Sequence, residues 1–81
     1  MILTFQVSDD GETLDVFFDG EGRDELIERL SDCQNPGDHY HLMAEDASVP
    51  GYALTTKRFY PGGIIVKFAT IGMPTQGPIQ E

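Results

Sequence analysis

Apolar and polar side chains alternate in several short segments of this chain, and only one segment has the apolar period of a helix. Alternation runs through Leu3–Val7 and again through Leu14–Phe18, with Asp9-Asp10-Gly11 between the two. Such alternation is typical of half-buried strands, and Gly11 is free to take a positive φ in a turn. The two segments therefore predict a β-hairpin.

The segment Arg23–Cys33 carries the helical stripe. Its apolar residues recur at positions i, i+1, i+4 and i+7: Leu26, Ile27, Leu30 and Cys33. A stripe with this spacing predicts an amphipathic helix whose apolar side faces the strands. Gly22 is the expected N-cap with Glu25 at the third helical position, and Asn35-Pro36-Gly37 ends the helix.

Three further strands are expected after the helix, at His39–Glu45, Tyr52–Lys57 and Ile64–Ile71. The order β-β-α-β-β-β predicts an α+β fold, in which one antiparallel sheet of about five strands carries the helix on one face. Residues 46–51 are expected to form a loop. At 81 residues the chain is one domain at most. We assign residues 1–72 to this domain and residues 73–81 to a flexible tail.

Charge excludes several classes of function. Fourteen acidic and five basic residues give a net charge of −9, and the sequence pI is near 4.3. Residues 1–46 hold 13 acids and two bases (−11), whereas residues 47–81 hold one acid and three bases (+2). Direct binding to nucleic acid or anionic lipid needs a positive surface, so we expect neither. The asymmetry predicts one strongly negative face and a basic protein partner.

The expected helix places that negative charge opposite its apolar stripe. At 100° per residue, five acids fall within about 100° of one another on a helical wheel. They are Glu21, Asp24, Glu25, Glu28 and Asp32. One interpretation is a solvated face that keeps the protein soluble, and the other is a docking surface for a basic partner. We take these five residues as the candidate partner-binding site.

Two histidines on the third expected strand form a second candidate patch. In His39-Tyr40-His41 both imidazoles point to one face, as a metal site requires. Two ligands are too few for zinc, so we expect no metal and no cofactor. Cys33 lies on the apolar stripe, which favours a buried thiol over a nucleophile. No catalytic motif is present, and we expect no enzymatic activity.

The expected location is the cytoplasm. Cys33 is the single cysteine, so no internal disulfide can form. The first residues, Met1-Ile2-Leu3-Thr4-Phe5-Gln6, contain no basic residue, and no apolar run reaches the length of a membrane span. We therefore predict neither a secretory signal nor a transmembrane helix.

Two segments are distinctive when they are taken together: Asp24-Glu25-Leu26-Ile27-Glu28-Arg29-Leu30 and, after a Pro-Gly-Asp break, His39-Tyr40-His41-Leu42-Met43. They resemble a family of small bacterial immunity proteins encoded in polymorphic-toxin and contact-dependent inhibition loci. The resemblance extends over about residues 14–71. It implies a small protein that binds and neutralises a cognate toxin domain.

The hypothesis that combines these observations is a non-enzymatic immunity or inhibitor protein. Its acidic helix and the acidic segments within Asp9–Glu21 would occlude the basic surface of a nuclease-like toxin domain. Opposite potentials accelerate encounter and add specificity. Three alternatives stay open at this point. They are a nucleic-acid mimic that inhibits a DNA-binding protein, a small metal-binding domain built on His39 and His41, and a structural subunit that adds a strand to a partner's sheet. The oligomeric state is not fixed by the sequence.

Overall fold

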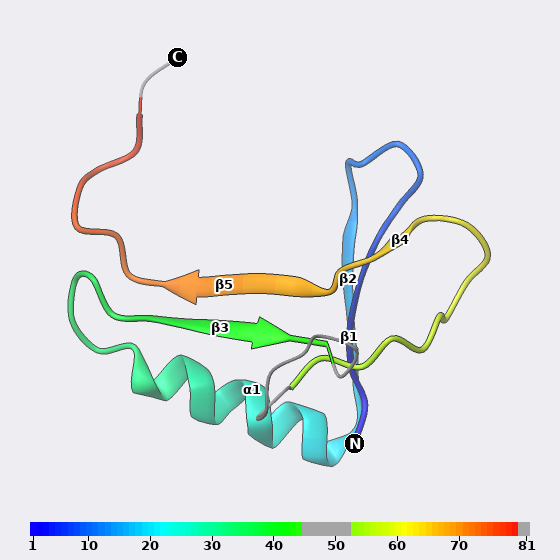
Figure 1. Ribbon diagram of the computed structural model, residues 1–81, viewed down its shortest axis with the longest axis horizontal. Helices are drawn as coiled ribbons and strands as arrows, with labels where there is room; N and C mark the ends of the chain where they lie inside the picture. Colours follow the sequence, from blue (N-terminus) through cyan, green and yellow to red (C-terminus); the bar gives the residue numbers. More distant parts are fainter. Residues whose placement is uncertain (45–52, 80–81) are drawn as a thin grey trace.

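The computed structural model describes residues 1–44 and 53–79. Five strands and one helix follow one another in the order β1 (Leu3–Val7), β2 (Leu14–Phe18), α1 (Gly20–Asp32), β3 (His39–Met43), β4 (Ile64–Ile65) and β5 (Phe68–Gly72). All of the strand pairings between these elements are antiparallel. The predicted α+β class and the predicted order of elements are confirmed (Figure 1).

The predicted hairpin is present over the predicted residues. β1 pairs with β2 so that Leu3 lies opposite Phe18 and Val7 lies opposite Leu14. Gly11 closes the turn with a φ of 75°, a left-handed conformation that only glycine adopts readily. The side chain of Asp10 accepts hydrogen bonds from the Ser8 hydroxyl and the Glu12 amide, which fixes the loop.

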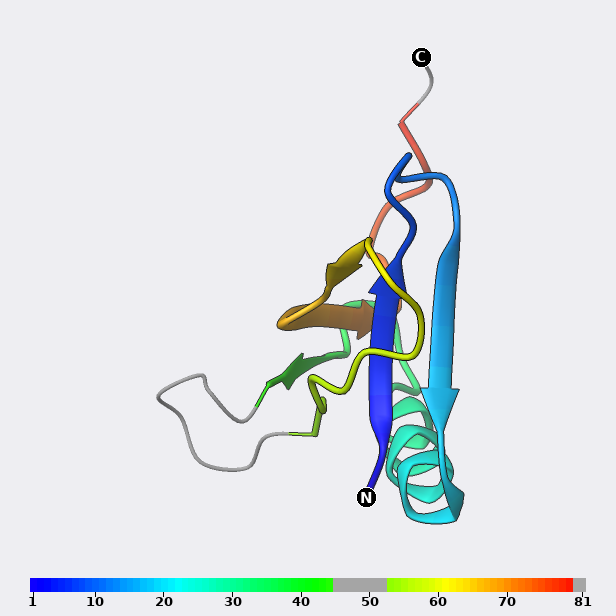
Figure 2. The same cartoon turned by 90° about the vertical axis from the view of Figure 1, so that its right-hand side faces the viewer.

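The strands divide between two sheets, which differs from the single sheet expected from the sequence. The predicted strand Ile64–Ile71 is broken: β4 pairs with β1, and β5 pairs with β3. At the break, the Val66 amide donates to Phe5 O of one sheet, and Lys67 O accepts from the Ala44 amide of the other. The chain thus passes from one sheet to the next within two residues. The sheet β2-β1-β4 therefore stands across the sheet β3-β5 (Figures 1 and 2).

The strand expected at Tyr52–Lys57 is absent from residues 53–57, the part of this range that the structure describes. Tyr52 lies outside the described residues, as do Glu45 and the loop expected at 46–51. Leu54 makes only an isolated parallel bridge to Ala44. Thr55 instead bonds to Leu3, with its amide donating to Leu3 O and its hydroxyl accepting from Leu3 N.

The helix begins three residues earlier than predicted, and its N-cap is Asp19 rather than Gly22. The Asp19 carboxylate accepts a hydrogen bond from the Gly22 amide at 2.8 Å. A carboxylate in this position accepts from an amide that has no partner within the helix. Its negative charge is also stabilised by the positive end of the helix dipole. Gly22 itself is buried against the chain before β1. A Cβ at this position would lie 1.7 Å from Ile2 O, so only glycine fits there.

The core lies where the two sheets and α1 meet. Its fully buried members are Leu3, Leu42, Ala44, Ala53 and Leu54. Of the helical stripe, Leu26 packs against this cluster as predicted. Ile27 and Leu30, however, are 53% and 52% exposed and are not among the residues packed against this core, so the apolar stripe is only partly buried. The helix is rotated so that Gly22, Leu26 and Arg29 face the sheets.

The C-terminal segment leaves the sheet after β5. Met73 is still held, since its amide donates to Asp38 O and its carbonyl accepts from the Gly37 amide. Residues 74–79 form neither helix nor strand and are exposed, and residues 80–81 lie outside the described chain. The flexibility of this tail stays a prediction.

Candidate protein-binding surface

The acidic residues of α1 lie mostly on its solvent side. Glu21, Asp24, Glu28 and Asp32 are exposed, whereas Glu25 is partly covered. The structure therefore brings the five candidate residues together along one helix. Together with Arg23 and Arg29 on the same helix they form what we call the acidic face. Five carboxylates and two guanidinium groups leave this face with three negative charges.

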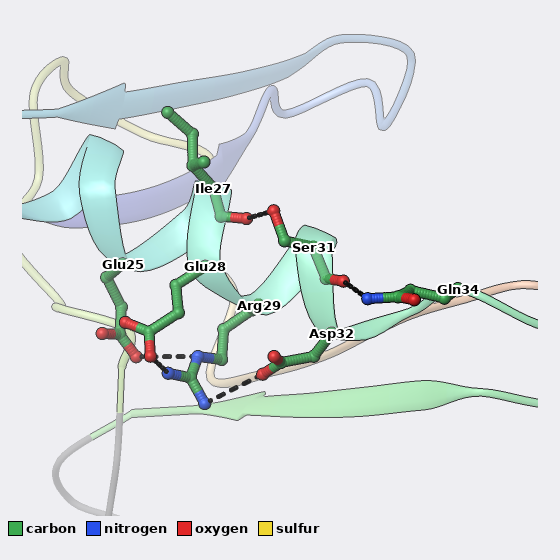
Figure 3. Close-up of polar contacts among 7 residues, drawn as sticks. All are labelled: Glu25, Ile27, Glu28, Arg29, Ser31, Asp32 and Gln34. Atoms are coloured by element: carbon green, nitrogen blue, oxygen red, sulfur yellow. Dashed lines mark hydrogen bonds and ion pairs between the residues drawn. The ribbon is translucent and has the colours of Figure 1, made fainter.

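Arg29 organises three of the five carboxylates (Figure 3). Its guanidinium lies 2.8 Å from Glu28 Oε1, 3.4 Å from Glu25 Oε1 and 3.4 Å from Asp32 Oδ2. The side chain is only 18% exposed, so these ion pairs are screened less than fully solvated ones. The repulsion expected between like charges four residues apart is thereby reduced.

The pKa of Arg29 reports the same arrangement. Burial alone would lower it, because desolvation penalises the charged form. The carboxylates of Glu25 and Glu28 outweigh this effect and raise the pKa of Arg29 above its ordinary value. The guanidinium also lies over the ring of Tyr40, 4.8 Å from its centroid. Arg29 thus joins the helix to β3 and stays charged.

Two carboxylates remain outside this cluster. Asp24 is 70% exposed, and its one ion pair among the described residues is with the neighbouring Arg23, at 3.1 Å. Glu21 is exposed and makes no ion pair in the part of the chain that the structure describes. These two residues at the N-terminal half of α1 are therefore the most available for a partner.

An exposed apolar edge borders the acidic face, and the sequence did not predict it. Ile27 points from α1 toward the side on which β2 lies, whereas Arg29 points toward β3 (Figure 3). Leu30 follows Ile27 along the same side of the helix, and both are about half exposed. Gly22 was the available signal, because a glycine within a helix permits close backbone approach, and a Cβ at Gly22 would lie 1.7 Å from Ile2 O.

Several other acids have structural roles and are not part of this surface. The Asp9 carboxylate accepts from the Gly63 amide at 2.6 Å. The Asp38 carboxylate accepts from the amides of Gln34 and Asn35, and these hydrogen bonds lower the pKa of Asp38. Hydrogen bonds, chiefly from Ser8, likewise lower the pKa of Asp10. These carboxylates hold turns, which accounts for their positions without a binding role.

The two histidines lie side by side on the exposed face of the sheet β3-β5. Their ring centroids are 5.0 Å apart, and the ring of His41 also contacts Phe68 at 5.1 Å. His41 Nδ1 bonds to the Thr70 hydroxyl, and His39 Nδ1 bonds to Gly37 O. Among the described residues no group of three or more His, Cys, Asp or Glu is placed to hold a metal. Cys33 is partly buried at the C-cap of α1.

The aromatic residues before β4 serve the fold. Phe59 stacks on Phe17 with ring centroids 4.7 Å apart. The buried amide of Gln6 accepts from the Phe59 amide and donates to Tyr60 O and Gly62 O. This segment is therefore fastened to β1 and β2, although Phe59 remains 45% exposed.

No family model, curated protein or solved structure matches this chain. Among the described residues, no helix combines the length and the apolar character needed to span a bilayer. The same residues enclose no pocket. The proposal below rests on the surface of α1.

Proposed function

We propose that this chain is a non-enzymatic protein-binding domain of the immunity or inhibitor type. Its acidic face binds a basic protein partner, most directly a nuclease-like toxin domain, and neutralises it by occlusion. The observation that carries the proposal is the exposed carboxylate surface of α1 beside the half-exposed Ile27 and Leu30. The resemblance of residues 24–30 and 39–43 to small immunity proteins agrees with it.

Electrostatics provides the mechanism. A nuclease binds polyanionic substrate on a positive surface, which a rigid row of carboxylates complements. The 13 residues of α1 extend for roughly 20 Å at the usual helical rise, enough to cover a substrate groove. Exposed charges such as Glu21 and Asp24 accelerate the encounter, and the apolar edge adds desolvated contact once the two proteins have met.

The proposal includes a cytoplasmic location. An inhibitor of a nuclease-like toxin acts where the nucleic-acid substrate of that toxin lies. The free thiol of Cys33 is compatible with a reducing compartment.

The first experiment recovers the partner. Affinity capture from the source cell, followed by mass spectrometry, is expected to yield a basic protein. The purified partner should have nuclease activity that one equivalent of this chain abolishes. A recovered partner whose activity is unchanged at saturating concentration contradicts the inhibitor assignment.

The second experiment tests the surface. Glu21→Lys is expected to slow association with that partner about tenfold and to reduce its dependence on ionic strength, since steering by exposed charge is screened beyond about 8–10 Å at physiological salt. Glu12→Lys is the matched control: it makes the same charge change on an exposed residue of the hairpin turn. Equal association rates for the two variants would exclude the acidic face as the docking surface.

A further inference from the structure

The outer edge of β5 offers main-chain groups for another strand. On its inner side, Lys67 O accepts from the Ala44 amide, and the Met73 amide donates to Asp38 O. Bonding alternates along an antiparallel strand, so Ala69 and Ile71 also turn their main-chain groups toward β3. The amides and carbonyls of Phe68, Thr70 and Gly72 therefore point away from the sheet.

This edge lacks the features that normally prevent strand addition. β5 reads Phe-Ala-Thr-Ile-Gly, with no charged residue and no proline. The other edges in the described chain are better protected. β2 carries Asp15, β4 has only two residues, and β3 is covered at one end where Met43 O accepts from the amides of Ala53 and Leu54.

An apolar wall stands beside this edge. Leu14 and Ile64 both pair with Val7, so their side chains share the core-facing side of the sheet β2-β1-β4 with Leu3. Leu3 is fully buried, but Leu14 and Ile64 are 56% and 65% exposed. The hairpin extends past β5 here, so no element of the described residues covers this part of its inner side (Figure 1).

We propose that a second copy of this chain adds its β5 antiparallel to β5, with the twofold axis at Thr70. The two sheets β3-β5 then form one continuous four-stranded sheet. Phe68 lies opposite Gly72 of the second copy, and Ala69 lies opposite Ile71 of the second copy. The side chains of the added strand cover the wall formed by Leu14 and Ile64.

The sequence of β5 is self-complementary in this register. Each of the two symmetry-related Phe68 rings lies opposite a Gly72, and each Ala69 lies opposite an Ile71. Pairing a large side chain with a small one suits packing across two strands. Lys67 falls opposite Met73, so no like charges meet. Neither β3 nor β5 contains a carboxylate, although the whole chain has a net charge of −9. A two-stranded sheet is also marginal alone and gains from more strands.

The dimer is independent of the proposed function. The acidic face of α1 belongs to a different element from the β5 edge, so either proposal can fail without the other.

Sedimentation velocity of the full chain from low micromolar to millimolar concentration tests the proposal. The wild-type chain is expected to shift from monomer to dimer as its concentration rises. Thr70→Lys places two ammonium groups opposite each other at the twofold axis and should weaken dimerisation at least tenfold. Thr56→Lys adds the same charge at an exposed threonine outside the sheets and should leave the dimer intact. A wild-type chain that is monomeric throughout overturns the proposal, as does a dimer that survives Thr70→Lys.

A crosslink tests the register and does not depend on the charge variants. In a Cys33→Ser background, Thr70→Cys should form an intermolecular disulfide on mild oxidation, because opposed residues at the axis lie about 5.5 Å apart between Cα atoms. Thr56→Cys in the same background should form little disulfide-linked dimer, because this position lies outside the proposed strand pair. Equal crosslinking of the two variants contradicts the proposed register, and circular dichroism verifies that both are folded.

Discussion

The guanidinium of Arg29 lies 4.8 Å from the centroid of the Tyr40 ring, between α1 and β3. A charged residue therefore occupies the side of the helix that faces the sheet β3-β5, where the sequence pattern predicts an apolar one. The carboxylates of Glu25, Glu28 and Asp32 surround it on the solvent side. We expect this contact to help hold the helix in its observed rotation, which sets the direction in which the acidic face points.

Replacing Arg29 by methionine should destabilise the fold by about 1 kcal/mol. The change removes the contact with Tyr40, which is worth about 0.5–1 kcal/mol when it is partly exposed, and leaves three carboxylates in mutual repulsion. Arg23→Met is the control, since Arg23 is 59% exposed and pairs only with Asp24. Urea unfolding of both variants measures the difference. Equal free energies of unfolding would show that Arg29 does not hold the helix in place.

Local signals in the sequence predicted the elements, whereas tertiary contacts decided their arrangement. The hairpin was predictable because alternation and Gly11 act within a few residues. The division of Ile64–Ile71 was not, because no glycine, proline or charge pattern marks Val66-Lys67 as a corner. The candidate carboxylates were placed on one helix correctly, but the burial of Arg29 among them depends on Tyr40, which is remote in sequence.

Gly22→Ala should destabilise the protein by about 1–3 kcal/mol, although alanine is the better helix former. A Cβ at this position would lie 1.7 Å from Ile2 O and 3.3 Å from Phe18 Cβ, so the backbone of α1 would have to move away from β1. Gly20→Ala is the matched control, because nothing lies within 4 Å of its added Cβ. Thermal unfolding should show a lower midpoint for the first variant and an unchanged or higher one for the second.

Gln6→Leu should destabilise the fold by about 2–4 kcal/mol. The side chain is fully buried, and its amide bonds three main-chain groups of the segment before β4. Leucine fills a similar volume but leaves the Phe59 amide and the Tyr60 carbonyl without this partner, whereas Gly62 O keeps its hydrogen bond from Arg58. Each buried polar group left unpaired costs about 1–3 kcal/mol. Gln34→Leu, at an exposed position, is the control. Faster hydrogen exchange in residues 59–63 would locate the effect, and unchanged exchange there would contradict it.

Asp19→Asn should make the stability of the protein less dependent on acid pH. Hydrogen bonds from the backbone of Ile2 and then of Gly22 lower the pKa of Asp19 in the folded chain below its ordinary value of 3.8. A carboxylate whose folded pKa is lowered contributes stability above the unfolded pKa, and this contribution is lost as the pH falls through the folded pKa. Asparagine accepts the same Gly22 hydrogen bond but does not titrate. The free energy of unfolding, followed by urea titration from about pH 5 to about pH 2, should therefore fall less steeply for Asp19→Asn than for the wild type. The remaining slope should come from carboxylates such as Asp10 and Asp38, whose pKa values are also lowered.

In Asp19→Ala the cap is lost at every pH, so that variant should be less stable than the wild type near neutrality and approach it in acid. Parallel curves for all three proteins would show that ionisation of Asp19 does not stabilise the start of α1.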